Sequence, residues 1–170
     1  EQHGIYATNT ANAVDLNVTV GKTGIVEGAL DGIYAVTDRT LLISGEAGEA
    51  IGVFDPETGI PRPATEDDFA SSIATITNQG IIRNLSKKSV DLAIHTDNTA
   101  TTINNEGLVL GTVDLDSRPG NHFINKAGGV WNTAGGINYL GAVDGDGLPI
   151  APNTVETRAG STIIAAADRA

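Results

Sequence analysis

The sequence predicts an all-β protein in which short parallel strands wind into stacked coils, a parallel β-helix or β-solenoid. The main observation is a recurring phrase, a small or polar residue followed by Gly and a short aliphatic run. Self-similarity at intervals of about 20–50 residues is typical of solenoids and other repeat folds. The phrase recurs at intervals of 28, 28, 28 and 27 residues, from Gly4 to Gly32, Gly24 to Gly52, Gly52 to Gly80 and Gly80 to Gly107.

The composition supports the same fold. The 170 residues include 21 Gly, no Cys and no Met, and only 4% are aromatic. Globular cores usually contain Phe, Trp and Met, whereas stacked Val, Ile, Leu and Ala pack rung on rung without them. Helical periodicity is poor because Gly recurs and β-branched residues cluster.

The charge excludes several classes of partner. The formal net charge is −11 and the pI is about 4.4. Binding to nucleic acid or to anionic lipid needs clustered Lys and Arg, so we expect neither. The acidic surface favours solubility, with calcium capture or a cationic partner as alternatives. No apolar run approaches about 18 residues, so we expect no membrane insertion by a helix, and the absence of Cys excludes disulfides.

The first half of the chain contains predicted strands separated by tight turns. Val14–Val20 alternates apolar and polar residues, which predicts a half-buried strand with its three valines and its leucine on one face. Gly21–Gly24 turns the chain into a strand at Ile25-Val26. Tyr34–Val36 and Leu41–Ile43 are the next predicted strands.

Residues Phe54–Phe69 break this pattern. The segment holds three prolines and the acidic run Glu66-Asp67-Asp68. Proline cannot donate to a strand ladder, so the segment is predicted to be a loop that projects from a coil. The glycine spacing resumes at Gly80, and we therefore expect the loop to replace part of the coil around Gly52 rather than to interrupt the array.

The pattern sharpens from Ala74 onwards. Three segments align on an apolar residue, one or two Asn, a spacer and Gly, with Gly80, Gly107 and Gly128 in equivalent positions. Asn tolerates left-handed backbone angles, and Asn side chains in register can hydrogen-bond along a stack. The alternative is that N-x-G marks hairpin turns of a β-sandwich, but hairpins recur every 8–12 residues or so. Further strands are predicted in Val90–Thr96, Gly111–Ser117 and Ser161–Ala165.

The second half of the chain resembles a known family. TITNQGIIRN, TINNEGLVLG and above all NHFINKAGGVWNTAGGINYLG (Asn121–Gly141) are similar to repeats in the passenger regions of bacterial autotransporters. The resemblance is good from about Ile73 to the C-terminus and weaker before it. It implies a right-handed parallel β-helix, exported across the outer membrane and often used in adhesion. Its motifs are structural, so no catalytic or binding residue can be carried over.

These observations lead to one expected architecture. We expect an all-β, right-handed parallel β-helix of about six or seven coils, from 170 residues at about 25 per coil. Residues 1–170 would form a single β-helical segment, a fragment of a longer surface protein, with a loop excursion at 54–69. Its terminal rungs would stack on further coils of the parent chain.

Acidic residues are the main candidates for chemistry, because polysaccharide lyases and hydrolases also use parallel β-helices. Glu66-Asp67-Asp68 could hold a hard cation or flank a glycosidic bond, although a solvated charge run is favoured. A lyase also needs a base, for which Arg118 is the closest candidate. Four aspartates fall in neighbouring coils and converge if the register is kept, although outward acids on a solenoid wall are favoured: Asp91, Asp97, Asp114 and Asp116.

Two short motifs fail as ligand sites. Asp144–Gly147 (DGDG) resembles the start of a calcium loop, but an EF-hand needs Glu at the twelfth position, where Val155 stands. A looser calcium turn remains a minor alternative. Gly21–Gly24 (GKTG) lacks the earlier Gly of a phosphate loop, since Leu16 occupies that position.

The remaining candidates are isolated side chains. Asn17 and Asn84 match the glycosylation pattern, which is frequent by chance. Trp131, the only Trp, is expected in the core, with an exposed platform for sugar rings as the alternative. Three histidines are far apart in the chain and lack metal-ligand spacing, so solvated or turn positions are favoured: His3, His95 and His122.

The expected function is that of a non-enzymatic, extracellular or cell-surface scaffold or adhesin segment of a bacterium, similar to an autotransporter passenger. We assign no catalytic, cofactor-binding or metal-binding residue. The expected partners are host or surface glycans or proteins. The alternative is a carbohydrate-active β-helix, such as a polysaccharide lyase or a phage tailspike.

Overall fold

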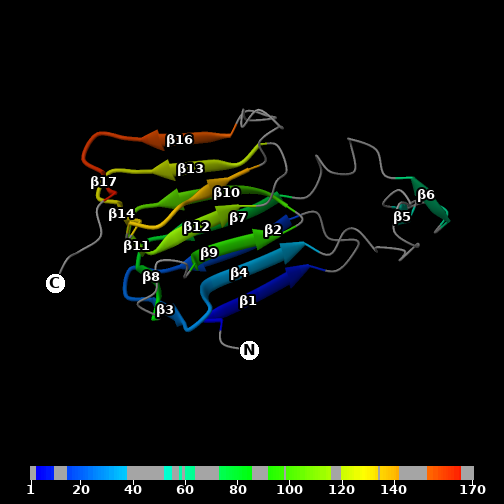
Figure 1. Ribbon diagram of the computed structural model, residues 1–170, viewed down its shortest axis with the longest axis horizontal. Helices are drawn as coiled ribbons and strands as arrows, with labels where there is room; N and C mark the ends of the chain where they lie inside the picture. Colours follow the sequence, from blue (N-terminus) through cyan, green and yellow to red (C-terminus); the bar gives the residue numbers. More distant parts are fainter. Residues whose placement is uncertain are drawn as a thin grey trace.

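All regular elements in the described part of the chain are β-strands, and most of them form three parallel sheets (Figure 1). The structure is a computed structural model that describes residues 3–9, 15–37, 52–54, 58, 60–63, 73–85, 92–97, 99–115, 120–133, 135–141 and 153–165, with the backbone alone at 52–54 and 61–63. Every strand pair within the three large sheets is parallel, which confirms the all-β prediction and excludes the hairpin-built β-sandwich.

Each sheet has five strands, and its order in space follows the order in the chain. Sheet A contains β1 (Ile5–Asn9), β4 (Asp31–Thr37), β9 (Leu92–Asp97), β12 (Thr112–Leu115) and β15 (Tyr139–Leu140). Sheet B contains β2 (Asp15–Val20), β7 (Ile73–Asn78), β10 (Ala100–Asn105), β13 (His122–Asn125) and β16 (Thr154–Thr157). Sheet C contains β3 (Ile25–Gly28), β8 (Ile81–Asn84), β11 (Leu108–Leu110), β14 (Val130–Asn132) and β17 (Thr162–Ile164).

The chain visits the sheets in the fixed order B, C, A, and each visit adds one rung to the stack. This is the arrangement of a β-solenoid. The described residues form four complete coils, with β1 before them and β16 and β17 after them. The described residues account for about five of the six or seven expected coils, and one long segment connects two of them without adding a strand to the three sheets in its described residues.

That segment connects β4 to β7 and occupies residues 38–72. β2 pairs directly with β7, and β4 pairs directly with β9, so the coils on either side of the segment stack on each other. Within the segment, β5 (Gly52–Phe54) and β6 (Pro61–Pro63) form an antiparallel hairpin that Figure 1 draws to one side of the stack. The predicted coil around Gly52 is therefore wrong. The excursion is inserted between two coils, and most of the expected loop 54–69 and the predicted strand Leu41–Ile43 lie outside the described residues.

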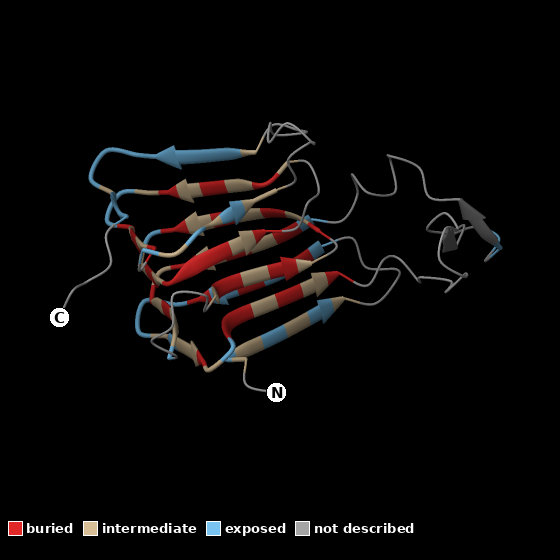
Figure 2. Cartoon of the chain, viewed as in Figure 1, coloured by how far each residue is buried: buried red, intermediate tan, exposed pale blue. Residues whose placement is uncertain are grey.

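The core lies between the three sheets, as the burial colours of Figure 2 show. In β2 the pattern alternates strictly, with Leu16, Val18 and Val20 buried as predicted and the residues between them exposed. Residues in register stack into columns: Val18 aligns with Ile76, Ile103 and Phe123 in sheet B, and Val26 with Ile82, Val109 and Trp131 in sheet C. Like side chains therefore pack on like, as the aromatic-poor composition predicts.

The corner between sheets B and C is held by a ladder of buried asparagines. Asn78 Nδ2 donates to Asn105 Oδ1, and Asn105 Nδ2 donates to Asn125 Oδ1, each at 2.8 Å. Each Nδ2 also donates to a backbone carbonyl, of Leu108, Val130 and Thr162 respectively. All three asparagines are fully buried. The predicted hydrogen bonding of Asn up and down the stack is confirmed.

Glycines stack immediately beside this ladder because the backbones of successive coils touch there. A Cβ on Gly80 would lie 2.2 Å from the carbonyl oxygen of Gly24, and one on Gly107 would lie 2.2 Å from that of Gly80. The fourth member is Gly129, since Leu108 pairs with Val130. The predicted equivalence of Gly128 is wrong by one residue. Gly128 instead has φ +85 in a turn, 126–129, that is longer than the turns after β7 and β10.

Candidate binding face on sheet A

The outward face of sheet A carries one column of ring-bearing and acidic side chains. Strand alternation places these residues outward because their neighbours in sequence point into the core: Ile33 and Ala35 flank Tyr34, and Val113 and Leu115 flank Asp114. The parallel register then aligns one such residue from each of the five strands. In order along the stack they are Tyr6, Tyr34, His95, Asp114 and Tyr139.

The first three members of the column form a stack of rings. The ring centroids of Tyr6 and Tyr34 lie 5.4 Å apart, and those of Tyr34 and His95 lie 4.8 Å apart with the planes 22° from parallel. These separations are close to the spacing of neighbouring strands, about 4.8 Å. His3 adds a fourth ring, 5.1 Å from Tyr34 and 5.8 Å from Tyr6.

Aspartates fix the rings of this stack. The Tyr34 hydroxyl donates to Asp97 Oδ2 at 2.6 Å, and His95 Nε2 lies 3.5 Å from Asp97 Oδ1. Burial, the hydrogen bond to Asp97 and the negative charge of that carboxylate raise the pKa of Tyr34 well above its usual range. At the other end, His3 Nδ1 lies 2.7 Å from Asp31 Oδ2. Tyr34 is therefore a neutral, oriented hydrogen-bond donor at neutral pH.

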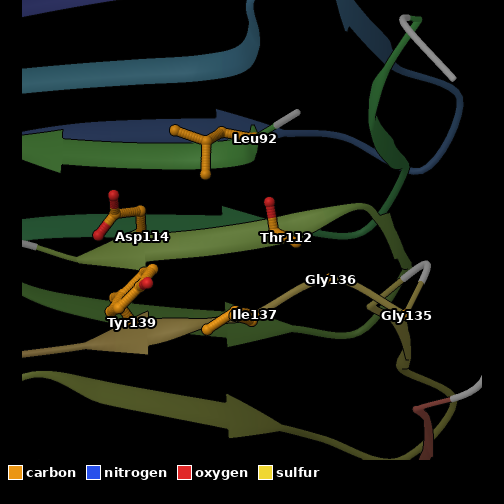
Figure 3. Close-up of a pocket in the computed structure, with 7 residues that line it drawn as sticks. All are labelled: Leu92, Thr112, Asp114, Gly135, Gly136, Ile137 and Tyr139. Carbon is orange, nitrogen blue, oxygen red and sulfur yellow. The ribbon is translucent and has the colours of Figure 1, made fainter. Parts of the chain in front are cut away.

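The column changes at its fourth member, where the short side chain of Asp114 stands between His95 and Tyr139. A pocket of about 330 Å³ opens at this point. Figure 3 shows Asp114, Tyr139 and Leu92 around the pocket, with Thr112 and the Gly135–Ile137 segment along its other side.

A bulge in β9 lies at the edge of the same pocket. Thr112 pairs with Leu92 but Val113 pairs with Ile94, so Ala93 has no partner in β12. Ala93 and Ile94 are both buried, and the alternation of β9 is reset between Leu92 and Ile94. As a result Leu92 lines the pocket while Ile94 fills the core. Bulges re-aim side chains in this way and are common beside functional sites.

Basic residues are scarce on the strands of all three sheets. Sheets A and B have no Lys or Arg on their strands, and sheet C has Arg83 alone. Three of the basic residues whose side chains are described pair with glutamates: Arg83 with Glu27, Lys126 with Glu106 and Arg158 with Glu156. Hydrogen bonds from Gln79 and Lys126 lower the pKa of Glu106, and one from Arg158 lowers that of Glu156.

The structure brings together only some of the residues considered from sequence. Asp97 and Asp114 lie on adjacent strands, but Asp114 stands opposite His95 rather than opposite Asp97. His3 and His95 each stack against Tyr34, although solvated or turn positions were favoured for them, and His122 lies on sheet B with Nδ1 2.7 Å from Thr154 Oγ1. Several candidates lie outside the described residues: Glu66, Asp67, Asp68, Asp91, Asp116, Arg118 and Asp144–Gly147.

The other single-residue candidates have structural positions. Trp131 is 4% exposed, stacks on Phe123 at 4.2 Å and donates from Nε1 to the Gly111 carbonyl, which confirms its core position. Gly21–Gly24 is a tight turn closed by a hydrogen bond from Gly24 N to Gly21 O. Asn17 faces outward on β2, whereas Asn84 donates to the Leu30 and Leu92 carbonyls.

Tyr6, Tyr34 and Tyr139 were not identified from sequence. A signal for the first two exists, because HGIYA and DGIYA place a tyrosine at the same position of two repeats 28 residues apart. Tyr139 has no such signal, since the chain between β12 and β15 has a different length from the earlier coils.

Within the described residues, no group of three or more His, Asp or Glu side chains is arranged to hold a metal ion, and no helix is long and apolar enough to cross a membrane. Comparison with known proteins found no matching family model, curated protein or solved structure.

Proposed function

We propose that the chain is a non-enzymatic scaffold or adhesin segment of a secreted or cell-surface bacterial protein, wound as a right-handed β-helix. The observation that carries this proposal is the continuous ladder of buried asparagines and touching glycines at one corner of the stack. Such a ladder fixes the register of every coil and makes the stack a stiff support. The right-handed winding and the cell-surface location are proposed from the similarity of its repeats to autotransporter passengers.

The last described rung supports a place within a longer stack. Val155 continues the column of Phe123, and Ile163 continues that of Trp131, yet both are at least 36% exposed. Apolar columns that end in solvent are the surface on which a further coil stacks. We therefore propose that the partners of this end are further coils of the parent protein.

The outer wall of sheet A is the proposed contact surface. It combines exposed tyrosines, a pocket and oriented polar groups on rigid strands, whereas on sheet C the charged outward residues Glu27 and Arg83 pair with each other. Sites on strands hold their side chains more precisely than sites on loops.

The location is tested on intact cells that express the parent protein. Antibodies raised against the purified chain are expected to label cells that have not been permeabilised, and brief proteinase K treatment of those cells should abolish the label. Cytoplasmic enzymes released only on lysis provide the control. Labelling that appears only after permeabilisation would overturn the proposal.

The absence of enzymatic activity is tested on the purified chain. We expect no new reducing ends and no unsaturated uronates when it is incubated with a panel of neutral and uronate-containing polysaccharides. Turnover that is lost in Asp114→Asn would instead establish the alternative, a carbohydrate-active β-helix.

A further inference from the structure

We propose that the outer wall of sheet B binds ice through a grid of threonine and asparagine side chains on β2, β7 and β10. This inference goes beyond the proposed function, because it concerns a different wall from sheet A and a ligand that is a surface of ordered water. Three observations carry it: the residues of the grid, their spacing, and the availability of their polar groups.

The grid consists of the outward residues of three neighbouring strands. In β2, β7 and β10 buried residues alternate with residues that point outward. The parallel register aligns the outward residues of the three strands without a bulge or shift. They form two columns, Asn17 with Thr75 and Thr102, and Thr19 with Thr77 and Asn104. All six side chains are uncharged, and each carries a hydroxyl or an amide that donates and accepts hydrogen bonds.

The spacing of the grid follows from the geometry of the sheet. Neighbouring strands lie about 4.8 Å apart, and residues i and i+2 of one parallel strand lie about 6.6 Å apart. These distances are close to the two repeat distances of water oxygens on a prism face of hexagonal ice. A grid with these dimensions can therefore bond to several water molecules of one ice surface at once.

The polar groups of the grid are available to a ligand. None of these six described side chains forms a hydrogen bond or ion pair within the chain. Asn78 and Asn105, the residues that follow Thr77 and Asn104, hydrogen-bond to each other in the core and fix the strands from behind. Threonine is also stiff at χ1 because it is branched at Cβ. The grid would therefore lose little conformational freedom on contact with ice.

The other two walls have different outward residues. The outward column of sheet A contains rings and acids, and the bulge at Ala93 shifts its register. On sheet C one outward column is aliphatic, with Ile25, Ile81, Leu108 and Val130 in register. Aliphatic side chains offer no hydrogen bonds to water. Among the described residues, sheet B is therefore the wall on which uncharged polar side chains repeat in both directions.

A soluble sugar fits the grid less well. Sites for small molecules are concave and lined mostly by apolar and aromatic side chains, whereas the grid lies on the face of a sheet and contains no ring. On β13 the two columns continue with His122 and Ile124, so the grid spans three strands. Its contact area is small, and we therefore expect the chain to slow the recrystallisation of ice rather than to lower the freezing point strongly.

The test measures adsorption of the purified chain to ice. The fluorescently labelled chain is mixed with labelled albumin, which growing ice excludes, and a single ice crystal is grown slowly from the solution. We expect the chain to be enriched in the ice while the albumin stays in the liquid. Ice grains in a frozen sucrose solution should also coarsen more slowly with the chain than with the same mass of albumin.

Matched variants locate the site. Thr77→Lys places a long charged side chain in the middle strand of the grid and is expected to abolish enrichment in ice, as is Thr19→Lys at its exposed edge. Thr8→Lys, the same change at an exposed outward position of β1 in sheet A, should leave enrichment unchanged. Thr75→Val keeps the shape of threonine without its hydroxyl, and the lost hydrogen bond should raise the concentration for half-maximal enrichment about fivefold. Urea unfolding checks that each variant is folded.

Three results would overturn the inference. They are exclusion of the parent chain from ice, no greater loss of enrichment in Thr77→Lys and Thr19→Lys than in Thr8→Lys, and unchanged adsorption of Thr75→Val. Binding to crystalline cellulose but not to ice would identify a polysaccharide surface instead. None of these results affects the cell-surface labelling, so failure of this inference is distinguishable from failure of the proposed function.

Discussion

Asn105 is the central member of the buried asparagine ladder, and its replacement by alanine tests whether that ladder holds the stack together. The side chain takes part in four hydrogen bonds. It accepts from Asn78 Nδ2 at 2.8 Å and from Gly107 N at 3.3 Å, and it donates to Asn125 Oδ1 at 2.8 Å and to Val130 O at 3.1 Å. Alanine would remove all four and leave buried partners behind.

The expected loss follows from the number of bonds. A buried hydrogen bond contributes about 1 kcal/mol net, and a buried group left without a partner costs about 1–3 kcal/mol. Four bonds therefore predict that Asn105→Ala lowers the free energy of unfolding by about 4 kcal/mol. A loss of this size is at the upper end of single substitutions and falls on the short list of mechanisms that produce such values.

The neighbouring residue provides the control. Asn104 is the same residue type on the same strand, but it faces outward and is only half-buried. Asn104→Ala should change the free energy of unfolding by no more than about 0.5 kcal/mol. Both variants are compared with the parent chain by urea unfolding followed by circular dichroism. If Asn105→Ala destabilised the chain no more than Asn104→Ala, the reasoning that the ladder fixes the stack would be refuted.

Three further outcomes are expected. Gly80→Ala should lower the free energy of unfolding, measured in urea, by about 2–3 kcal/mol because the added Cβ would meet the backbone of the neighbouring coil. Gly21→Ala should leave it unchanged because no atom lies within 4 Å of a Cβ at that position. Equal effects of the two variants would contradict the close stacking of coils. Trp131→Ala should lower the free energy of unfolding by about 3–5 kcal/mol because the side chain is buried. A fluorescence maximum of the parent chain equal to that of a Trp in water would contradict this burial. Because the raised pKa of Tyr34 keeps it neutral, its contribution to stability is present below about pH 10 and is lost as the pH rises towards its folded pKa. The 295 nm difference titration between the parent and Tyr34→Phe should place its ionisation well above pH 10 or so, and an ordinary midpoint would contradict the hydrogen bond to Asp97.

The repeats were predictable because coil geometry imposes them directly on the sequence. Residues that follow equivalent glycines are paired in the sheets. Ile5 after Gly4 pairs with Ile33 after Gly32, and Ile81 after Gly80 pairs with Leu108 after Gly107. The register of each sheet requires equivalent residues at equivalent points of every coil. The asparagine ladder was predictable for the same reason.

The coil at Gly52 was predicted wrongly because the glycine interval alone does not define a coil. A coil also needs an alternating strand before its turn, such as Val14–Val20 before Gly24. The residues that precede Gly52, GEAGEAI, lack that alternation. Placing the hairpin outside the stack leaves Gly24 free to contact Gly80.

Most of the candidate site could not be predicted from the sequence, because its residues come from five strands with connections of unequal length. Asp114 aligns with His95 only through the bulge at Ala93, which shifts the register by one residue. Tyr139 joins the column through a coil whose turns differ in length from those before it. Spacing between residues does not reveal a column when insertions and bulges change the number of residues per coil.

The excursion between β4 and β7 also divides the folding of the stack into unequal parts. Asp15 and Ile73 are paired neighbours, yet about twice as much chain separates them as separates Ile73 from Ala100, which raises the entropy cost of closing that loop by about 0.6 kcal/mol. We therefore expect folding to nucleate among the contiguous coils from β7 to β14 and to reach β2, β3 and β4 last. The boundary between the coil of β2, β3 and β4 and the coil of β7, β8 and β9 would also be the first to open when the chain is pulled from its N-terminus.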